Sequence, residues 1–178
     1  MTERMKDIRQ YVLCLLEKAG ISITPEEAGK IEYCDYGLGL FDRVGTSILT
    51  YVNTARVCAK EILMLPGQIC PEHLHPALDG YVGKEETFRC RWGDVYLYVP
   101  GEPAEKPAGH VPDEYLPYFT VWHELHLFPG QQYTLKEQTL HWFQAGAQGA
   151  VVSEFSTPSF DDTDIFTAPQ IIRKGYYL

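Results

Sequence analysis

From about residue 46 onward, the chain is a series of short segments rich in β-branched and aromatic residues, separated by turn-forming pairs. The pairs are Pro66-Gly67, Trp92-Gly93, Pro100-Gly101 and Pro129-Gly130. β-Branched and aromatic side chains suit a pleated, half-buried surface, whereas Gly and Pro favour turns. The clearest predicted strands are residues 47–52, 56–65, 87–91, 95–99, 119–128 and 150–156. Many short strands with turn signals every ~8–12 residues favour an all-β sandwich or barrel.

The residues before this region predict two short helices. Apolar residues recur at helical spacing in residues 2–19, followed by Gly20 as a helix-ending residue. They are Ile8, Val12, Leu15 and Leu16. A second helix is predicted to begin at Thr24, with Pro25 in its first position and Glu27 completing a capping box.

The predicted elements fit one domain of residues 1–178. Residues 1–45 form its N-terminal helical and extended segment, residues 46–156 its barrel, and residues 157–178 a C-terminal segment. Residues 101–117 are Pro-rich and polar, so we expect a loop between two halves of the barrel. A chain of 178 residues is long enough to bury a full core without a disulfide.

Composition excludes several functions. The formal net charge is −9 and no stretch is rich in Lys or Arg, so we expect neither a nucleic-acid partner nor an anionic membrane surface. No apolar run approaches the ~20 residues of a membrane span, and residues 1–10 lack the apolar core of a signal peptide. The five cysteines are scattered and form no CxxC pair, which is typical of a reducing compartment. We therefore expect a cytoplasmic protein.

Four residues form a candidate metal-ligand set: His73 and His75 in an HxH pattern, Glu86, and His141. Residues two apart in a strand point to the same face, so the HxH pair would project both imidazoles into one cavity. Three imidazoles and one carboxylate suit Mn²⁺, Fe²⁺, Co²⁺, Ni²⁺ or Zn²⁺. Four protein ligands leave open positions only on a five- or six-coordinate ion, which favours Mn²⁺, Fe²⁺ or Co²⁺ over tetrahedral Zn²⁺.

These residues and their spacing resemble the cupin motifs. Gly67, five residues, the HxH pair, then Glu86, six residues and Gly93 is similar to the first cupin motif, with a wider gap before the glutamate. Pro129-Gly130 followed by His141 resembles the second, without the usual Asn after it. The resemblance implies a cupin barrel, that is, a jelly roll or double-stranded β-helix, with short N-terminal helices.

A closer resemblance extends over residues 51–173. The stretches YVNTARVCAKEILMLPGQICPEHLHP, GKEETFRCRWGDVYLY, LHWFQAGAQGAVVSEFS and FDDTDIF are similar to bacterial D-lyxose ketol-isomerases of the cupin type. That family implies proton transfer between C1 and C2 of an open-chain sugar through an enediol, converting D-lyxose to D-xylulose and, as a side activity, D-mannose to D-fructose. It also implies Mn²⁺ as the metal, a small-molecule sugar as the partner, and a homodimer.

The same resemblance implies roles for further residues. Glu154 matches the carboxylate that acts as the base, and Lys84, two residues before Glu86, would stabilise the enediolate oxygen or relay a proton. Asp164 and Arg173 match positions that bind sugar hydroxyls or order the C-terminal segment. His123, in a predicted strand, is a candidate substrate contact.

Each assignment has a structural alternative. Lys84 follows Gly83 near a predicted turn and would then be a surface lysine, and Glu154 would lie on the solvent face of its strand. Asp161, Asp162 and Asp164 lack the spacing of a calcium loop and are typical of a capping or solvated turn.

Three alternative functions stay open. A phosphosugar isomerase would need a basic phosphate pocket, and an Fe(II) dioxygenase, which uses the same ligand set, would consume oxygen. A non-catalytic sugar sensor would not need Lys84 and Glu154 beside the metal.

Overall fold

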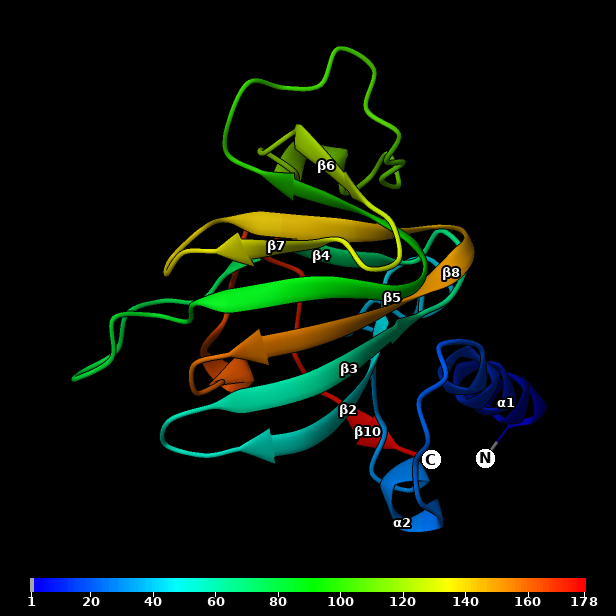
Figure 1. Cartoon of the computed structure of the whole chain (residues 1–178). Helices are drawn as coiled ribbons and strands as arrows, with labels where there is room; N and C mark the ends of the chain where they lie inside the picture. Colours follow the sequence, from blue (N-terminus) through cyan, green and yellow to red (C-terminus); the bar gives the residue numbers. More distant parts are fainter. Residues whose placement is uncertain (1) are drawn as a thin grey trace.

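Two long, bent strands organise the molecule. The computed structural model describes residues 2–178, in which β5 (Glu86–Val99) and β8 (His141–Ser156) pair antiparallel from Glu86↔Ser156 to Tyr98↔Trp142 (Figure 1). The pairing is irregular between Cys90 and Val95, where both strands bend. Because each strand continues beyond the bend, it belongs to two different layers of sheet.

Gly93 explains the bend and corrects one prediction. The pair Trp92-Gly93 does not separate two strands but lies within β5, which joins the predicted strands 87–91 and 95–99. Gly93 has φ +69°, and a Cβ there would lie 2.0 Å from the carbonyl oxygen of Gly149 on β8. A turn and a β-bulge both use a glycine with positive φ, so the sequence signal alone did not distinguish them.

The other strands extend these two layers. The C-terminal half of β8 pairs with β3, and the N-terminal half of β5 pairs with β7, which gives the first layer the order β10-β1-β2-β3-β8-β5-β7. The N-terminal half of β8 pairs with β4, which gives the second layer the order β9-β4-β8-β5-β6. The bounds are β1 Glu32–Cys34, β2 Thr46–Asn53, β3 Cys58–Met64, β4 Ile69–Leu74, β6 His123–Leu127, β7 Gln132–Leu135, β9 Ile165–Phe166 and β10 Tyr176–Tyr177. The all-β prediction is confirmed, although the hydrogen-bonded sheet of residues 2–178 does not close into a barrel.

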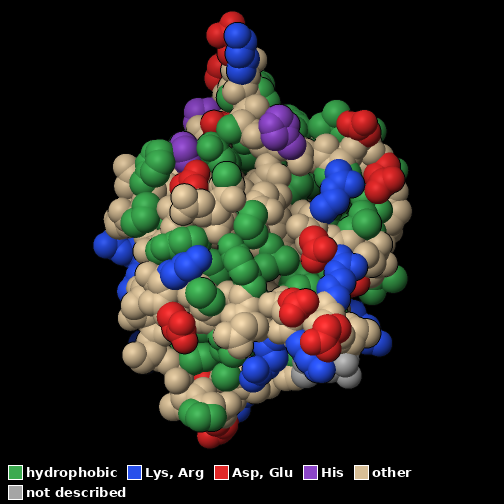
Figure 2. Space-filling view, turned by 90° about the vertical axis from the view of Figure 1, so that its right-hand side faces the viewer, with side chains coloured by type: hydrophobic (Ala, Val, Ile, Leu, Met, Phe, Trp, Pro, Cys, Tyr) green, Lys and Arg blue, Asp and Glu red, His purple; other side chains and the backbone are tan. Residues whose placement is uncertain are grey.

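Both predicted helices are present. α1 (Glu3–Lys18) begins at the N-cap Thr2, and its buried face, including Val12 and Leu15, packs with Leu49 of β2 and Leu63 of β3. α1 therefore covers the outer surface of the first layer (Figure 1). On the side of the molecule where α1 lies, basic and acidic side chains are interspersed, without a large patch of one charge (Figure 2).

The second helix, α2 (Pro25–Ala28), has the predicted capping box: Thr24 Oγ1 accepts from the Glu27 amide, and the Glu27 carboxylate accepts from the Thr24 amide. No helix within residues 2–178 is long and apolar enough to cross a membrane.

Other boundaries differ from the predictions. Of the predicted strand 119–128, only β6 is a strand, and a 3₁₀ turn, η1 (Leu116–Tyr118), precedes it. The buried carboxylate of Glu72 accepts hydrogen bonds from the amides of Thr120 and Val121, which holds this backbone outside the sheet. Pairing with β4 and β5 extends the predicted strand 150–156 back to residue 141. β7 and the short strands β1, β9 and β10 were not predicted. The strand expected for the HxH pair is β4, which contains His73 but ends before His75.

The C-terminal segment crosses from one layer to the other. It contains the short 3₁₀ helix η2 (Asp161–Thr163), then β9 on β4 of the second layer, and ends in β10 on β1 of the first. Between these contacts, the Ile172 amide donates to the carbonyl of Tyr36 (2.9 Å). The segment therefore closes one side of the space between the layers.

Candidate metal centre and active site

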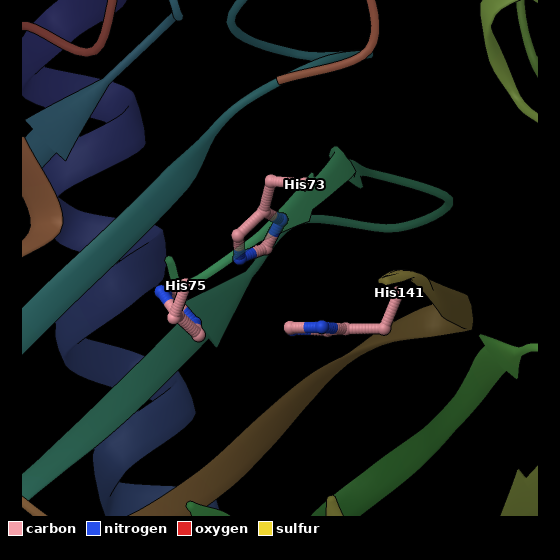
Figure 3. Close-up of side chains that lie close together, drawn as sticks. All are labelled: His73, His75 and His141. Atoms are coloured by element: carbon pink, nitrogen blue, oxygen red, sulfur yellow. The ribbon is translucent and has the colours of Figure 1, made fainter. Parts of the chain in front are cut away.

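Three histidines converge in the interior, where β4 ends and β8 begins. His73 lies in β4, His75 just after it, and His141 is the first residue of β8, paired directly with His73 (Figure 3). Their ring centroids lie 4.3–5.5 Å apart, and their potential ligand atoms all lie within 4.8 Å of one another. All three side chains are buried.

Hydrogen bonds on the outer ring nitrogen orient each histidine. Nδ1 of His73 lies 2.8 Å from the Pro71 carbonyl, and Nδ1 of His141 lies 2.9 Å from the Thr139 carbonyl. Nδ1 of His75 lies 2.5 Å from Asp164 Oδ1. These oxygens accept a hydrogen bond from Nδ1–H, so the lone pair of each neutral imidazole is on Nε2. Metal-binding histidines with outer-shell partners have the same arrangement.

Glu86 adds a carboxylate to the same point. Its Oε1 lies 3.2 Å from Nε2 of both His75 and His141. Among residues 2–178, Nε2 of His75 and Nε2 of His141 are buried and make no hydrogen bond. Buried polar atoms are normally paired, so lone pairs that converge in this way indicate a site for a cation.

The protonation states fit this interpretation. Burial and the neighbouring imidazoles hold the pKa of His73 well below its usual range, and burial lowers that of His141 to about 4. Burial opposes ionisation of Glu86 as well, but Lys84 and His75 outweigh it and hold its pKa well below normal. For His75, Glu86 and Asp164 outweigh burial and raise the pKa to about 9, so the cluster attracts positive charge. Neutral imidazoles and a carboxylate are the ligand forms that a divalent metal needs. His73, His141 and Glu86 already have these forms, and a metal would replace the proton that Glu86 and Asp164 hold on His75.

Lys84 and Glu154 form a buried ion pair beside this centre. Lys84 Nζ lies 2.6 Å from Glu154 Oε1 and 2.8 Å from Glu86 Oε2, and both Lys84 and Glu154 are buried. Glu154 Oε1 also accepts from Ser156 Oγ at 3.1 Å. Burial would lower the pKa of Lys84, but the two carboxylates outweigh it and raise the pKa well above normal, so Lys84 is an ammonium. Lys84 precedes β5 rather than lying in it, yet it faces the interior, so it is not a surface lysine.

Asp164 and Arg173 reach the site from the C-terminal segment. Asp164 holds His75, and burial, which outweighs the attraction of His75, raises the pKa of Asp164. Arg173 forms an ion pair with Glu32 and lies 3.7 Å from Asp161 Oδ2.

His123, the other candidate substrate contact, lies outside the site. Its Nδ1 lies 2.9 Å from the Glu102 carbonyl, and it is not among the residues of the described chain that line the cavity. β6 pairs with the far half of β5, which carries His123 away from the metal centre.

Sequence reasoning missed Lys60 and misjudged Asp161. Lys60 lies on β3 directly opposite Glu154, and its Nζ contacts Ser159 Oγ at 2.8 Å and both carboxylate oxygens of Asp161 at 2.9 and 2.7 Å. Asp161 is therefore not in a solvated turn. The lysine of an otherwise largely apolar strand was the available signal, but its partner lies 101 residues away.

Most of the groups that form the metal centre and its surroundings line one cavity of about 40 Å³, although His141 is not among its lining residues. Its polar lining includes His73, His75, Lys84, Glu86, Glu154, Lys60, Asp161, Asp164 and Arg173, together with Tyr36, Thr46 and Cys70. Its apolar lining is Ile48, Ile62, Phe88 and Phe143. A buried acid–base pair beside a cation site is an arrangement suited to proton transfer.

Solved structures with similar folds include sugar isomerases. The L-ribose isomerase of Acinetobacter sp. in complex with L-ribose aligns with a TM-score of 0.79 at 17% identity, covering 96% of this chain and 94% of that one. The ligand-free L-ribose isomerase of Cellulomonas parahominis aligns with a TM-score of 0.78 at 16% identity, covering 99% and 97%. At these identities the similarity establishes the fold, and it confirms the predicted cupin type.

Relatives found by sequence have a much higher identity to this chain than these solved structures do. The chain is 57% identical over 171 residues to a D-lyxose ketol-isomerase of Thermofilum sp., covering 96% of this chain and 95% of the relative. It is 55% identical to a D-lyxose/D-mannose isomerase of Thermosediminibacter oceani, covering 96% and 94%. It is 52% identical to a D-lyxose ketol-isomerase of Cohnella laeviribosi, covering 94% and 92%. No family model matches the chain. With this identity over nearly its whole length, the chain belongs to the family of the D-lyxose ketol-isomerases.

Proposed function

We propose that this protein is a metal-dependent aldose–ketose isomerase that interconverts D-lyxose and D-xylulose. The observation that carries the proposal is the buried Lys84–Glu154 pair, 2.6 Å apart, beside three converging histidines and Glu86. Removal of a proton from carbon needs a base, and the charge that develops on oxygen needs a cation nearby. Both are present in one cavity.

Glu154 is the proposed base. Its carboxylate removes the proton from C2 of the open-chain aldose, the electron pair forms the C1=C2 double bond of an enediol, and the proton returns to C1. A second proton moves from O2 to O1, for which the Lys84 ammonium is the proposed donor and relay. Lys84 also supplies the positive charge that a buried carboxylate requires. Since its pKa is well above normal, Lys84 does not serve as the base.

His73, His75, His141 and Glu86 are the proposed metal ligands. When bound, a divalent ion would supply a Lewis acid for the sugar oxygens on C1 and C2. Mn²⁺ is the proposed ion, and Co²⁺, Fe²⁺, Ni²⁺ and Zn²⁺ suit the same donors. Asp164 would hold His75 in the ligating tautomer.

The charges in the cavity favour a neutral sugar over a sugar phosphate. Within the described chain, each cation that lines the cavity has a carboxylate partner. Lys84 contacts Glu154 and Glu86, Lys60 contacts Asp161, and Arg173 contacts Glu32. A phosphate would have to displace one of these carboxylates, whereas a sugar hydroxyl bonds to either partner of a pair.

We propose that the sugar enters beside Arg173. A cavity of about 40 Å³ holds a few water molecules rather than a pentose. Asp161 and Arg173 line this cavity and also an open groove on the surface, together with Asn53 and Phe160. An outward shift of the C-terminal segment would join the two spaces and admit the substrate.

Two finer points belong to the same proposal. The relative of T. oceani bears the name D-lyxose/D-mannose isomerase, which supports D-mannose to D-fructose as a side activity. The homodimer implied by the family stays a prediction, which sedimentation equilibrium of the purified protein tests.

The deciding experiment measures ketose formation from D-lyxose by metal-stripped protein, with and without added Mn²⁺, for the wild type and for Glu154→Gln. We expect Mn²⁺-dependent D-xylulose formation that falls by about 10³-fold or more in Glu154→Gln, because a positioned acid–base group contributes about 10²–10⁴-fold. Glu61→Gln is the matched control: Glu61 is another buried carboxylate of the same sheet, but it points to the outer face and accepts from Ser153 Oγ.

The outcomes separate the alternatives. Equal loss in both variants would remove Glu154 as the base. Absence of ketose with every metal, together with sugar-dependent oxygen consumption, would favour the Fe(II) dioxygenase. Sugar binding without turnover would favour the sensor.

A further inference from the structure

A second polar group lies in the cavity, away from the metal centre. It consists of Tyr36, Thr46 and Cys70, which are 2%, 1% and 6% exposed and all line the same cavity as Glu154. Tyr36 Oη lies 3.0 Å from Thr46 Oγ1 and 3.2 Å from Cys70 Sγ. We call these residues the hydroxyl trio.

Strand register separates the trio from the catalytic pair. On the inner face, Glu154 of β8 lies opposite Lys60 of β3, and the next inward pair is Ile62 opposite Ile48 of β2. Thr46 lies two residues beyond Ile48, deeper in the molecule. The cavity therefore has reactive polar groups at one end, an apolar stretch, and the trio beyond it.

The hydrogen bonds within the trio do not use all of its donors and acceptors. Two hydroxyls and one thiol carry three hydrogens, but among residues 2–178 these side chains make only the two contacts given above. At least one hydrogen and several oxygen lone pairs stay free. A sugar hydroxyl, which donates and accepts at once, complements such a group.

The backbone at Tyr36 supports a functional position. Tyr36 has φ +56°, in the left-handed region that costs a non-glycine residue free energy and that is enriched at functional sites. The C-terminal segment holds it there: the Ile172 amide donates to its carbonyl, and Phe166 packs edge-on against its ring at 5.6 Å. This conformation places the hydroxyl in the cavity wall.

We propose that the hydroxyl trio binds the terminal hydroxyl of the open-chain sugar, at the carbon farthest from the aldehyde. This rests on the proposed function, in which C1 and C2 lie at the metal centre and Glu154, so that the other end of the chain points inward. Tyr36 and Thr46 are then specificity-determining residues: they recognise the end of a pentose and limit what extends beyond it.

The test pairs enzyme variants with a substrate that lacks the terminal hydroxyl. kcat and KM are measured for D-lyxose and 5-deoxy-D-lyxose with the Mn²⁺-loaded wild type, Tyr36→Phe and Thr46→Val. We expect the wild type to prefer D-lyxose by a factor about 5- to 10-fold larger than that of either variant, the size of one hydrogen bond. The change should appear in KM with kcat little altered, because this contact is remote from the reacting carbons.

Two control variants remove buried hydroxyls outside the cavity. Tyr33 is 1% exposed and its hydroxyl makes no hydrogen bond in the described structure, and Ser47 neighbours Thr46 but points to the opposite face of β2. Tyr33→Phe and Ser47→Ala should keep the wild-type preference.

Three outcomes are distinguishable. A wild type that forms no ketose from D-lyxose overturns the proposed function itself. An active wild type whose preference is unchanged in both Tyr36→Phe and Thr46→Val overturns the role of the trio. If one of these variants does not fold, the other decides, because each removes a hydroxyl of the same trio.

Discussion

The metal centre and the cluster formed by Lys60, Ser159 and Asp161 are both buried and charged, but they differ in how their polar atoms are partnered. In the cluster, the Lys60 ammonium has three oxygen contacts within 2.9 Å. At the metal centre, Nε2 of His75 and Nε2 of His141 make no hydrogen bond within the described chain. Because an unpaired buried polar atom is costly, the first arrangement is typical of structural docking and the second of a ligand site.

The largest expected effect follows from removing one of the unpaired nitrogens. We expect His141→Gln to bind Mn²⁺ more than about 100-fold more weakly, beyond the loss usual for an outer-shell partner. Titration calorimetry of the stripped protein measures this directly, and thermal unfolding checks it, since bound ligand stabilises the native state. His126→Gln is the control, because His126 pairs with Asp94 outside the cavity. Unchanged affinity in His141→Gln would refute the proposed ligand set.

The second effect concerns the cluster of Lys60, Ser159 and Asp161, in which the Lys60 ammonium has three oxygen partners. Lys60 is 3% exposed and lies 2.7 Å from Asp161 Oδ2. We expect Lys60→Met to lower the free energy of unfolding by about 3 kcal/mol, because it leaves Asp161 without its main counter-charge. Lys60→Met with Asp161→Asn should recover part of that loss, as measured by urea unfolding. A double variant no more stable than Lys60→Met would show that the pair does not act as a unit.

The third effect tests the link between the two regions, since Asp164 and Asp161 lie on one segment. We expect Asp164→Asn to weaken Mn²⁺ binding by about 10- to 30-fold, within the range for a residue that orients a ligating histidine. Asp162, exposed and two residues away, provides the control Asp162→Asn. If both substitutions leave the Mn²⁺ affinity unchanged, the contact between Asp164 and His75 has no role in metal binding.

The two regions also differ in how far sequence predicted them. The HxH pair, Glu86 and His141 were recognisable because strand alternation and motif spacing are local properties, and the structure brings these residues together. Lys84 faces the interior as expected, although the backbone there is not a strand. The contact between Lys60 and Asp161 joins residues 101 apart, and no local pattern indicates which partner a buried lysine has.

In the fold, too, sequence predicted local features but not contacts between distant residues. Helix caps at Thr2 and Thr24 depend on neighbouring residues, and the cap at Thr24 was predicted in detail. β5 was predicted as two strands because a glycine such as Gly93 is typical of a turn between strands. Only the close approach of Gly149 on β8 shows that Gly93 forms a β-bulge within one strand. Tyr36 escaped notice because neither its left-handed backbone nor its contacts with Thr46 and Cys70 follow from residue type.

The smallest effect is the pH dependence of the stability that the cluster of Lys60, Ser159 and Asp161 contributes. Burial would raise the pKa of Asp161, but Lys60 and Lys84 outweigh it and hold the pKa far below the usual value of about 3.9. A depressed carboxyl pKa stabilises the native state fully above the unfolded-state value, and this contribution declines as the pH falls further. Asp161→Asn should therefore cost about 1–2 kcal/mol at pH 7, and the same at pH 5. The difference between wild type and variant should shrink below about pH 4, where the unfolded carboxyl becomes protonated. Urea unfolding at pH 7, 5 and 3.5 measures it, with Asp162→Asn showing little difference at any pH. A difference that persists unchanged at pH 3.5 would mean that packing of the side chain, rather than its charge, docks the C-terminal segment beside the metal centre.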